Sequence, residues 1–103
     1  LSLHDALPIL IGVEESSETS EANFALKVSG NSMEPRFHDG DLVLIKSQPS
    51  VELGDIGIFI INDEGFIKKF GGDKLISLNP EFDDIDLHEY DDIYCRGRVI
   101  GVI

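Results

Sequence analysis

The stretch IGIFIINDEGFIKKF, residues 56–70, decides the fold class of this chain. Its two apolar runs, 56–61 and 66–70, are short and rich in the β-branched and aromatic residues that favour strands. Between them, NDEG at 62–65 is a short polar connection containing glycine, which is typical of a β-hairpin. The sequence therefore predicts two strands that pair in antiparallel fashion.

Similar short apolar runs recur along the chain, separated by clusters of Gly, Pro, Asn and Asp. The segment at 33–41 can form at most one helical turn, because Pro35 lacks an N–H donor and Asp39-Gly40 favours a turn. We therefore expect a mainly β fold of compact, curled antiparallel sheets with at most short helical turns. The further strand-like runs are FALKVSG (24–30), DLVLIK (41–46), KLISL (74–78) and IYCRGRVIGVI (93–103).

The composition is that of one ordinary globular domain of 103 residues, with 42% hydrophobic and 27% charged residues. No apolar run approaches the roughly 18 to 20 residues of a membrane helix, which predicts a soluble protein. Twenty acidic against eight basic residues give a net charge of -12, which disfavours direct contact with DNA. The single Cys95 cannot form an internal disulfide, which favours a reducing, cytoplasmic location.

Nothing in the sequence indicates a metal or a cofactor. His4, His38 and His88 are scattered, with neither an HExxH pattern nor cysteine partners at zinc-site spacing. The acidic segment PEFDDIDLHEYDD at 80–92 lacks the glycine and glutamate spacing of an EF-hand loop. We interpret it as a solvated, charged surface.

The first 22 residues are expected to lie outside the folded domain, which we place at 23–103. EESSETSEA at 14–22 is polar and acidic without apolar periodicity, as in a linker. HDALPI at 4–9 is what a common sequencing-adapter oligonucleotide encodes when read in frame. We therefore interpret residues 1–9 as a candidate non-native stretch, with the natural chain starting further upstream.

Ser32 lies in GNSMEP, a tight turn between two strand-like runs. A serine hydroxyl is a poor nucleophile at neutral pH and needs a base within hydrogen-bond reach, usually histidine and sometimes neutral lysine. The spacing of the histidines does not suggest such a base. A serine that serves only the turn remains the alternative.

The segment GFIKKF at 65–70 offers two lysines as the base. Strand alternation sets Phe66, Lys68 and Phe70 on one face and Lys69 on the other. Lys68 is thus flanked by two aromatic rings, and burial favours the neutral form that a base requires. The alternative is an edge-strand lysine that extends to solvent.

Several blocks of the chain resemble the C-terminal peptidase domain of the LexA and phage CI-like repressors, in the order and spacing of that family. The resemblance runs from about Phe24 to the end of the chain. The blocks are ALKVSGNSMEPRFHDGDLVLI (25–45), ELGDIGIFII (52–61), GFIKKF (65–70), LISLNPEFDDI (75–85) and GRVIGVI (97–103).

The resemblance implies a Ser-Lys dyad in which neutral Lys68 accepts the proton of Ser32. The serine then attacks a peptide bond in the repressor's own linker, usually Ala-Gly. Backbone N–H groups of Asn31 and Ser32 would hold the oxyanion, with Met33 and Pro35 as supports. The resemblance also implies a homodimer, stimulation by the RecA filament, and DNA binding only through an upstream helix-turn-helix domain.

The chain also departs from the family pattern. The residues before Ser32 contain no helix-turn-helix motif and no scissile linker, and no Ala-Gly pair occurs in the chain. Three alternatives therefore stand beside the repressor hypothesis. They are a UmuD-like polymerase accessory protein, a type I signal peptidase-like enzyme, and a binding or dimerisation domain without catalysis.

Overall fold

A computed structural model describes residues 2–3, 6–9 and 22–103, and these residues form nine strands and no helix. The prediction of a mainly β fold is confirmed. The described residues thus include no helix that could cross a membrane. The strands are β1 (Ser2–Leu3), β2 (Ala6–Ile9), β3 (Phe24–Val28), β4 (Leu42–Ser47), β5 (Ile56–Ile61), β6 (Glu64–Phe70), β7 (Lys74–Ile76), β8 (Ile85–Asp86) and β9 (Ile93–Val102).

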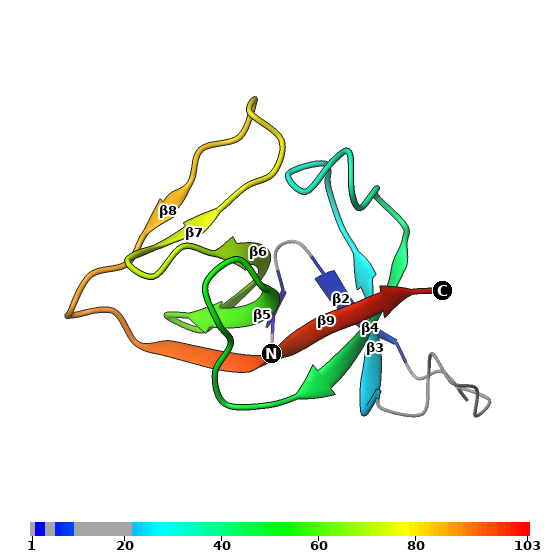
Figure 1. The fold of residues 1–103 in the computed structure, drawn as a ribbon, viewed down its shortest axis with the longest axis horizontal. Helices are drawn as coiled ribbons and strands as arrows, with labels where there is room; N and C mark the ends of the chain where they lie inside the picture. The colour runs from blue at the N-terminus through cyan, green and yellow to red at the C-terminus, as the bar shows by residue number, and fades with distance from the viewer. Residues whose placement is uncertain (1, 4–5, 10–21) are drawn as a thin grey trace.

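The strands form one curled sheet in the order β2-β3-β4-β9-β5-β6-β7-β8, and β1 pairs with β6. Every pairing along this order is antiparallel, whereas β1 and β6 are parallel. In Figure 1, β9 runs across the molecule from the half that holds β5 to β8 to the half that holds β3 and β4. This one strand therefore joins the two halves of the sheet.

The hairpin expected from residues 56–70 is present. β5 pairs with β6 along its whole length, with Ile61 opposite Glu64. The connection is only Asn62 and Asp63, whose φ angles are +48° and +72°. Two positive φ angles give a turn whose twist matches that of the flanking strands, and Asn and Asp tolerate this conformation better than most residues.

β9 serves both halves of the sheet through two shifts in register, one opposite Leu44/Ile45 of β4 and one opposite Ile58/Phe59 of β5. Such bulges bend a strand and increase its twist. Gly97 lies between them, where an added Cβ would be 2.5 Å from the carbonyl oxygen of Lys46. The close approach of β4 and β9 therefore requires glycine at this position.

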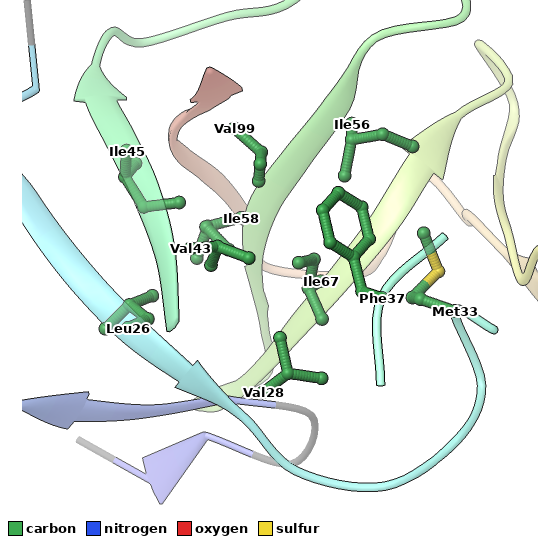
Figure 2. Close-up of a cluster of buried hydrophobic side chains, with 10 residues drawn as sticks. All are labelled: Leu26, Val28, Met33, Phe37, Val43, Ile45, Ile56, Ile58, Ile67 and Val99. Carbon is green, nitrogen blue, oxygen red and sulfur yellow. The ribbon is translucent and has the colours of Figure 1, made fainter. Parts of the chain in front are cut away.

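β5 is buried on both faces and separates two hydrophobic clusters. Ile56 and Ile58 belong to the larger cluster, and Phe59 and Ile61 to the smaller one. The larger cluster, drawn in Figure 2, comprises Leu26, Val28, Met33, Phe37, Val43, Ile45, Ile56, Ile58, Ile67 and Val99. The smaller cluster has Phe59, Ile61 and Leu75 at its centre, with Phe66, Phe70 and other half-buried residues packed around them.

Three short strands lie outside the predicted pattern. β8 falls in the acidic segment, where Ile85 is half-buried and packs against the smaller cluster. β1 and β2 fall in the segment expected to precede the domain, and they pair with β6 and β3. The expected linker at 14–22 lies outside the described residues except for Ala22, so the domain boundary at residue 23 stays a prediction.

Candidate functional site

Ser32 lies on a tight turn that leaves the end of β3. Gly30 opens the turn with a φ of +92°, a conformation that suits glycine, and its N–H donates to Oδ1 of Asp39 at 2.8 Å. The N–H of Phe37 donates to the carbonyl of Met33 at 3.0 Å, which makes the single helical turn expected here. The sequence thus forms a compact loop in which Ser32 is held near its beginning.

Two apolar side chains anchor this loop in the larger cluster. Met33 and Phe37 are only 1% and 2% exposed. Figure 2 shows the Phe37 ring near Ile56 and Ile67 of the β5–β6 hairpin, with Met33 beside Phe37 in the same cluster. The residue next to the serine is therefore fixed by core packing, as expected for Met33. Pro35 is exposed on the same loop.

Lys68 reaches the site from β6. Phe66 and Phe70 of the same face pack against the smaller cluster, and Nζ of Lys68 lies 6.0 Å from the centroid of the Phe66 ring. Lys68 is 3% exposed, whereas Lys69 is only half-buried. Because adjacent residues of a strand face opposite sides, Lys68 is buried while its neighbour Lys69 is only partly covered.

The two side chains meet in the interior. Lys68 Nζ donates a hydrogen bond to Ser32 Oγ at 2.7 Å, and Ser32 is 5% exposed. A neutral amine at this distance could accept the hydroxyl proton, with the direction of the hydrogen bond reversed. The geometry would therefore allow proton transfer between the Ser32 hydroxyl and a neutral Lys68 amine.

The histidines that the structure describes do not compete with Lys68 for this role. His38 is exposed on the Ser32 loop, and its Nδ1 lies 3.7 Å from Asp41. His88 is exposed and stacks on Tyr90 with ring centroids 5.0 Å apart. His4 lies outside the described residues, and within those residues no three His, Cys, Asp or Glu side chains gather in a metal-binding group.

One residue at the site was missed by the sequence analysis. The backbone N–H of Asn79 donates to the carbonyl of Ser32 at 3.0 Å, and its side-chain Nδ2 donates to the carbonyl of Asn31, also at 3.0 Å. In the sequence, this residue stands out only as part of the block LISLNPEFDDI (75–85) that carries the family resemblance. The sequence signal that could have identified Asn79 is an Asn-Pro pair directly after a strand, since Asn side chains often bond to nearby backbone.

Cys95 behaves as an ordinary strand residue on β9. Burial raises the pKa of its thiol, although a backbone hydrogen bond with Gly97 acts in the opposite direction. A raised pKa makes the reactive thiolate scarce at neutral pH. Cys95 is therefore a poor nucleophile.

A buried serine beside a buried lysine on an all-β domain defines a class of candidate sites, those of hydrolases in which the two residues act as a pair. Comparison with known proteins supports a peptidase family. The profile of the family described as Peptidase S24-like matches residues 3–100. The chain belongs to the Peptidase S24-like family.

Curated relatives share the name LexA repressor. The protein of Oleidesulfovibrio alaskensis is 33% identical over 95% of this chain and 50% of its own length. The protein of Desulfitobacterium hafniense is 33% identical over 98% of this chain and 48% of its own length, and that of Desulforamulus reducens is 37% identical over 78% and 38%. The chain thus spans about half the length of the curated relatives it matches.

Proposed function

We propose that this chain is the regulatory peptidase domain of a self-cleaving transcriptional repressor, in which Ser32 and Lys68 cut the repressor's own linker. The observation that carries the proposal is the 2.7 Å contact between two buried side chains, Lys68 Nζ and Ser32 Oγ. Burying a charged lysine is costly in free energy unless it is paired or becomes neutral. The relatives named LexA repressor support the same function.

The proposed reaction begins when neutral Lys68 accepts the proton of Ser32 as Oγ attacks the carbonyl carbon of the scissile bond. The tetrahedral intermediate collapses, the C–N bond breaks, and the ammonium of Lys68 returns the proton to the leaving amine. An ester between Ser32 and the N-terminal fragment remains. A water molecule, deprotonated by Lys68, hydrolyses this ester and regenerates the serine.

The oxyanion of the intermediate would be held by the backbone N–H groups of Asn31 and Ser32. The carbonyl of Asn31 is directed at Nδ2 of Asn79. Because C=O and N–H point in opposite directions across a trans peptide, the N–H of Ser32 is directed away from Asn79. This orientation supports Ser32 as an oxyanion donor.

Cleavage would regulate DNA binding through separation of domains. In the proposed repressor this domain forms a homodimer, and an upstream helix-turn-helix domain binds DNA in the cytoplasm. Because dimerisation raises DNA affinity by avidity, cutting the linker weakens operator binding without altering the recognition surface. The net charge of -12 is consistent with leaving DNA contact to another domain, and the RecA filament is the proposed stimulating partner.

The test uses the full-length protein with its native linker, incubated at pH 8 to 10 and followed by gel electrophoresis and fragment mass. Ser32→Ala and Lys68→Ala should each abolish cleavage while circular dichroism stays that of the β fold. Lys69→Ala is the matched control, because it removes the neighbouring lysine from the same strand, and it should cleave at the wild-type rate. Cleavage by either the Ser32 or the Lys68 variant would refute the dyad.

A further inference from the structure

The loop after β7 contacts the turn that carries Ser32. We infer that Asn79 in this loop is a positioning residue for the nucleophile. It holds the serine through two backbone carbonyl groups, that of Asn31 just before Ser32 and that of Ser32 itself. This inference rests on the proposed function, because it assigns to Asn79 an effect on the reactivity of Ser32. Asn79 itself touches neither Oγ of Ser32 nor Nζ of Lys68 through any of the hydrogen bonds described above.

Asn79 uses its backbone and both ends of its side-chain amide. Its N–H donates to the carbonyl of Ser32 and its Nδ2 to the carbonyl of Asn31, each at 3.0 Å. Its Oδ1 accepts the N–H of Glu81 at 3.0 Å. The last bond sets the orientation of the amide, because oxygen can only accept and the NH₂ group can only donate.

The loop that carries Asn79 is itself fastened at its base. Ser77, which is 8% exposed, donates its N–H to Oδ1 of Asp84 and its hydroxyl O–H to the carbonyl of Asp83, each at 3.0 Å. The loop follows β7, and β7 pairs with β6 through Ile76 opposite Lys69. Asn79 is therefore connected through short, paired segments to the strand that holds Lys68.

Asn79 thus links the two parts of the site. Ser32 comes from the loop between β3 and β4, and Lys68 comes from β6, four places along the sheet from β3. Hydrogen bonds from Asn79 to two successive carbonyls, together with the Glu34 N–H that donates to the Asn31 carbonyl at 3.2 Å, fix the peptide planes of the Ser32 turn. They thereby fix the direction of the Ser32 N–H. An error of about 1 Å in such a placement can slow a reaction roughly a hundredfold.

The experiment measures the reactivity of Ser32 in the 103-residue chain with a fluorophosphonate. In this reaction Oγ of Ser32 forms a bond to phosphorus, the P–F bond breaks, fluoride leaves, and the hydroxyl proton passes to Lys68. Peptide mass spectrometry identifies the labelled residue, and the second-order rate constant is measured from pH 7 to 10. No linker is needed for this measurement.

Asn79→Asp is the main variant. Its carboxylate still accepts the N–H of Glu81, but it loses the NH₂ donor and sets an oxygen against the carbonyl of Asn31. Asn79→Ser is a second, uncharged variant whose hydroxyl can also accept the Glu81 N–H without supplying the amide donor. We expect each variant to label Ser32 roughly ten- to a hundredfold more slowly than the wild type, with an unchanged shape of the pH profile because Lys68 still accepts the proton.

Asn62→Asp is the matched control. It replaces another side-chain amide that donates to an acceptor, Asp91 Oδ1, and accepts a backbone N–H, that of Asp92, each at 3.0 Å. Asn62 lies at the β5–β6 turn, where its side-chain amide bonds to Asp91 and Asp92 and not to the Ser32 loop. The control should lose about as much thermal stability as the Asn79 variants, and it should keep the wild-type rate of Ser32 labelling.

The outcomes separate the two proposals. If the wild type is labelled at Ser32 and both Asn79 variants fold and label at the wild-type rate, Asn79 has no positioning role and the dyad stands. If the Asn62 control loses as much labelling rate as the Asn79 variants, the loss reflects reduced stability and the positioning role is refuted. If the pH profile of labelling is displaced in the Asn79 variants, Asn79 acts on Lys68 and not on Ser32, which also refutes the inference. A folded wild type that is not labelled at Ser32 would overturn the proposed function and this inference with it.

Discussion

Lys68 and Ser32 are 36 residues apart in the sequence, yet Nζ and Oγ of these residues lie 2.7 Å apart. Both side chains are buried, and they come from separate halves of the curled sheet. The contact depends on core packing on both sides. Met33 and Phe37 anchor the serine loop, and Phe66 and Phe70 flank the lysine.

Self-cleavage of the full-length protein should accelerate as the pH rises from 7 to 10. Lys68 can accept the proton of Ser32 only when its amine is neutral, and the neutral fraction grows by at most about tenfold per pH unit. First-order rate constants from gel densitometry at constant ionic strength will measure this. A rate that is flat or that falls over this range would argue against lysine as the base.

Phe37→Ala should destabilise the domain strongly, because the ring is 2% exposed in the larger cluster. Truncating a buried phenylalanine costs about 3–5 kcal/mol, which for a domain of this size lowers the Tm by roughly 10 °C or more. Leu53→Ala, at a side chain 72% exposed, is the control and should change the stability by less than about 0.5 kcal/mol. Thermal unfolding followed by circular dichroism compares the two, and equal Tm values would contradict the packing of Phe37.

Gly97→Ala should be much more harmful than Gly101→Ala, although both lie on β9. A Cβ at 97 would be 2.5 Å from the backbone oxygen of Lys46, whereas a Cβ at 101 has its nearest neighbour at 3.7 Å. Overpacking of this kind costs about 1–3 kcal/mol. Urea unfolding measures both variants, and a Gly97 variant as stable as the Gly101 variant would contradict the close approach of β4 and β9.

Asn62→Gly should raise the pKa of Asp91. The pKa of this carboxyl is held below its usual value first by the N–H of His88 and then by the Asn62 side chain, and glycine removes the second bond while keeping the positive φ of the turn. A lowered pKa stabilises the fold above the pKa of the unfolded chain, and this contribution is lost as the pH falls through the folded value. The variant should therefore lose less stability on acidification than the wild type.

NMR titration of the Asp91 carboxyl measures the first effect, and urea unfolding between pH 3 and 6 measures the second. Ser50→Gly is the control, since it introduces a glycine at an exposed position, and Ser50 is not among the residues that act on the Asp91 carboxyl. Its carboxyl titration should match the wild type. An unchanged Asp91 titration in Asn62→Gly would show that the Asn62 bond does not affect this carboxyl.

Much of the fold was predictable because its signals are local. The apolar runs at 24–30, 41–46, 56–61 and 66–70 and the polar NDEG connection predict strands and a hairpin from neighbouring residues alone. β8 was not predicted, because two residues in an acidic segment carry no periodicity and pair only where β7 is already in place. The long-range order of the strands around β9 likewise has no local signal.

The sequence by itself determined the longer strands, the turn that carries Ser32, and which of the two lysines shares a strand face with Phe66 and Phe70, since each follows from alternation or turn chemistry within a few residues. Only the tertiary structure decided that Lys68 and Ser32 meet inside the domain and that Asn79 bonds to the serine turn. Those contacts join segments 36 and 48 residues apart. Their distances depend on how the sheet curls and how both clusters pack, which no short stretch of sequence specifies.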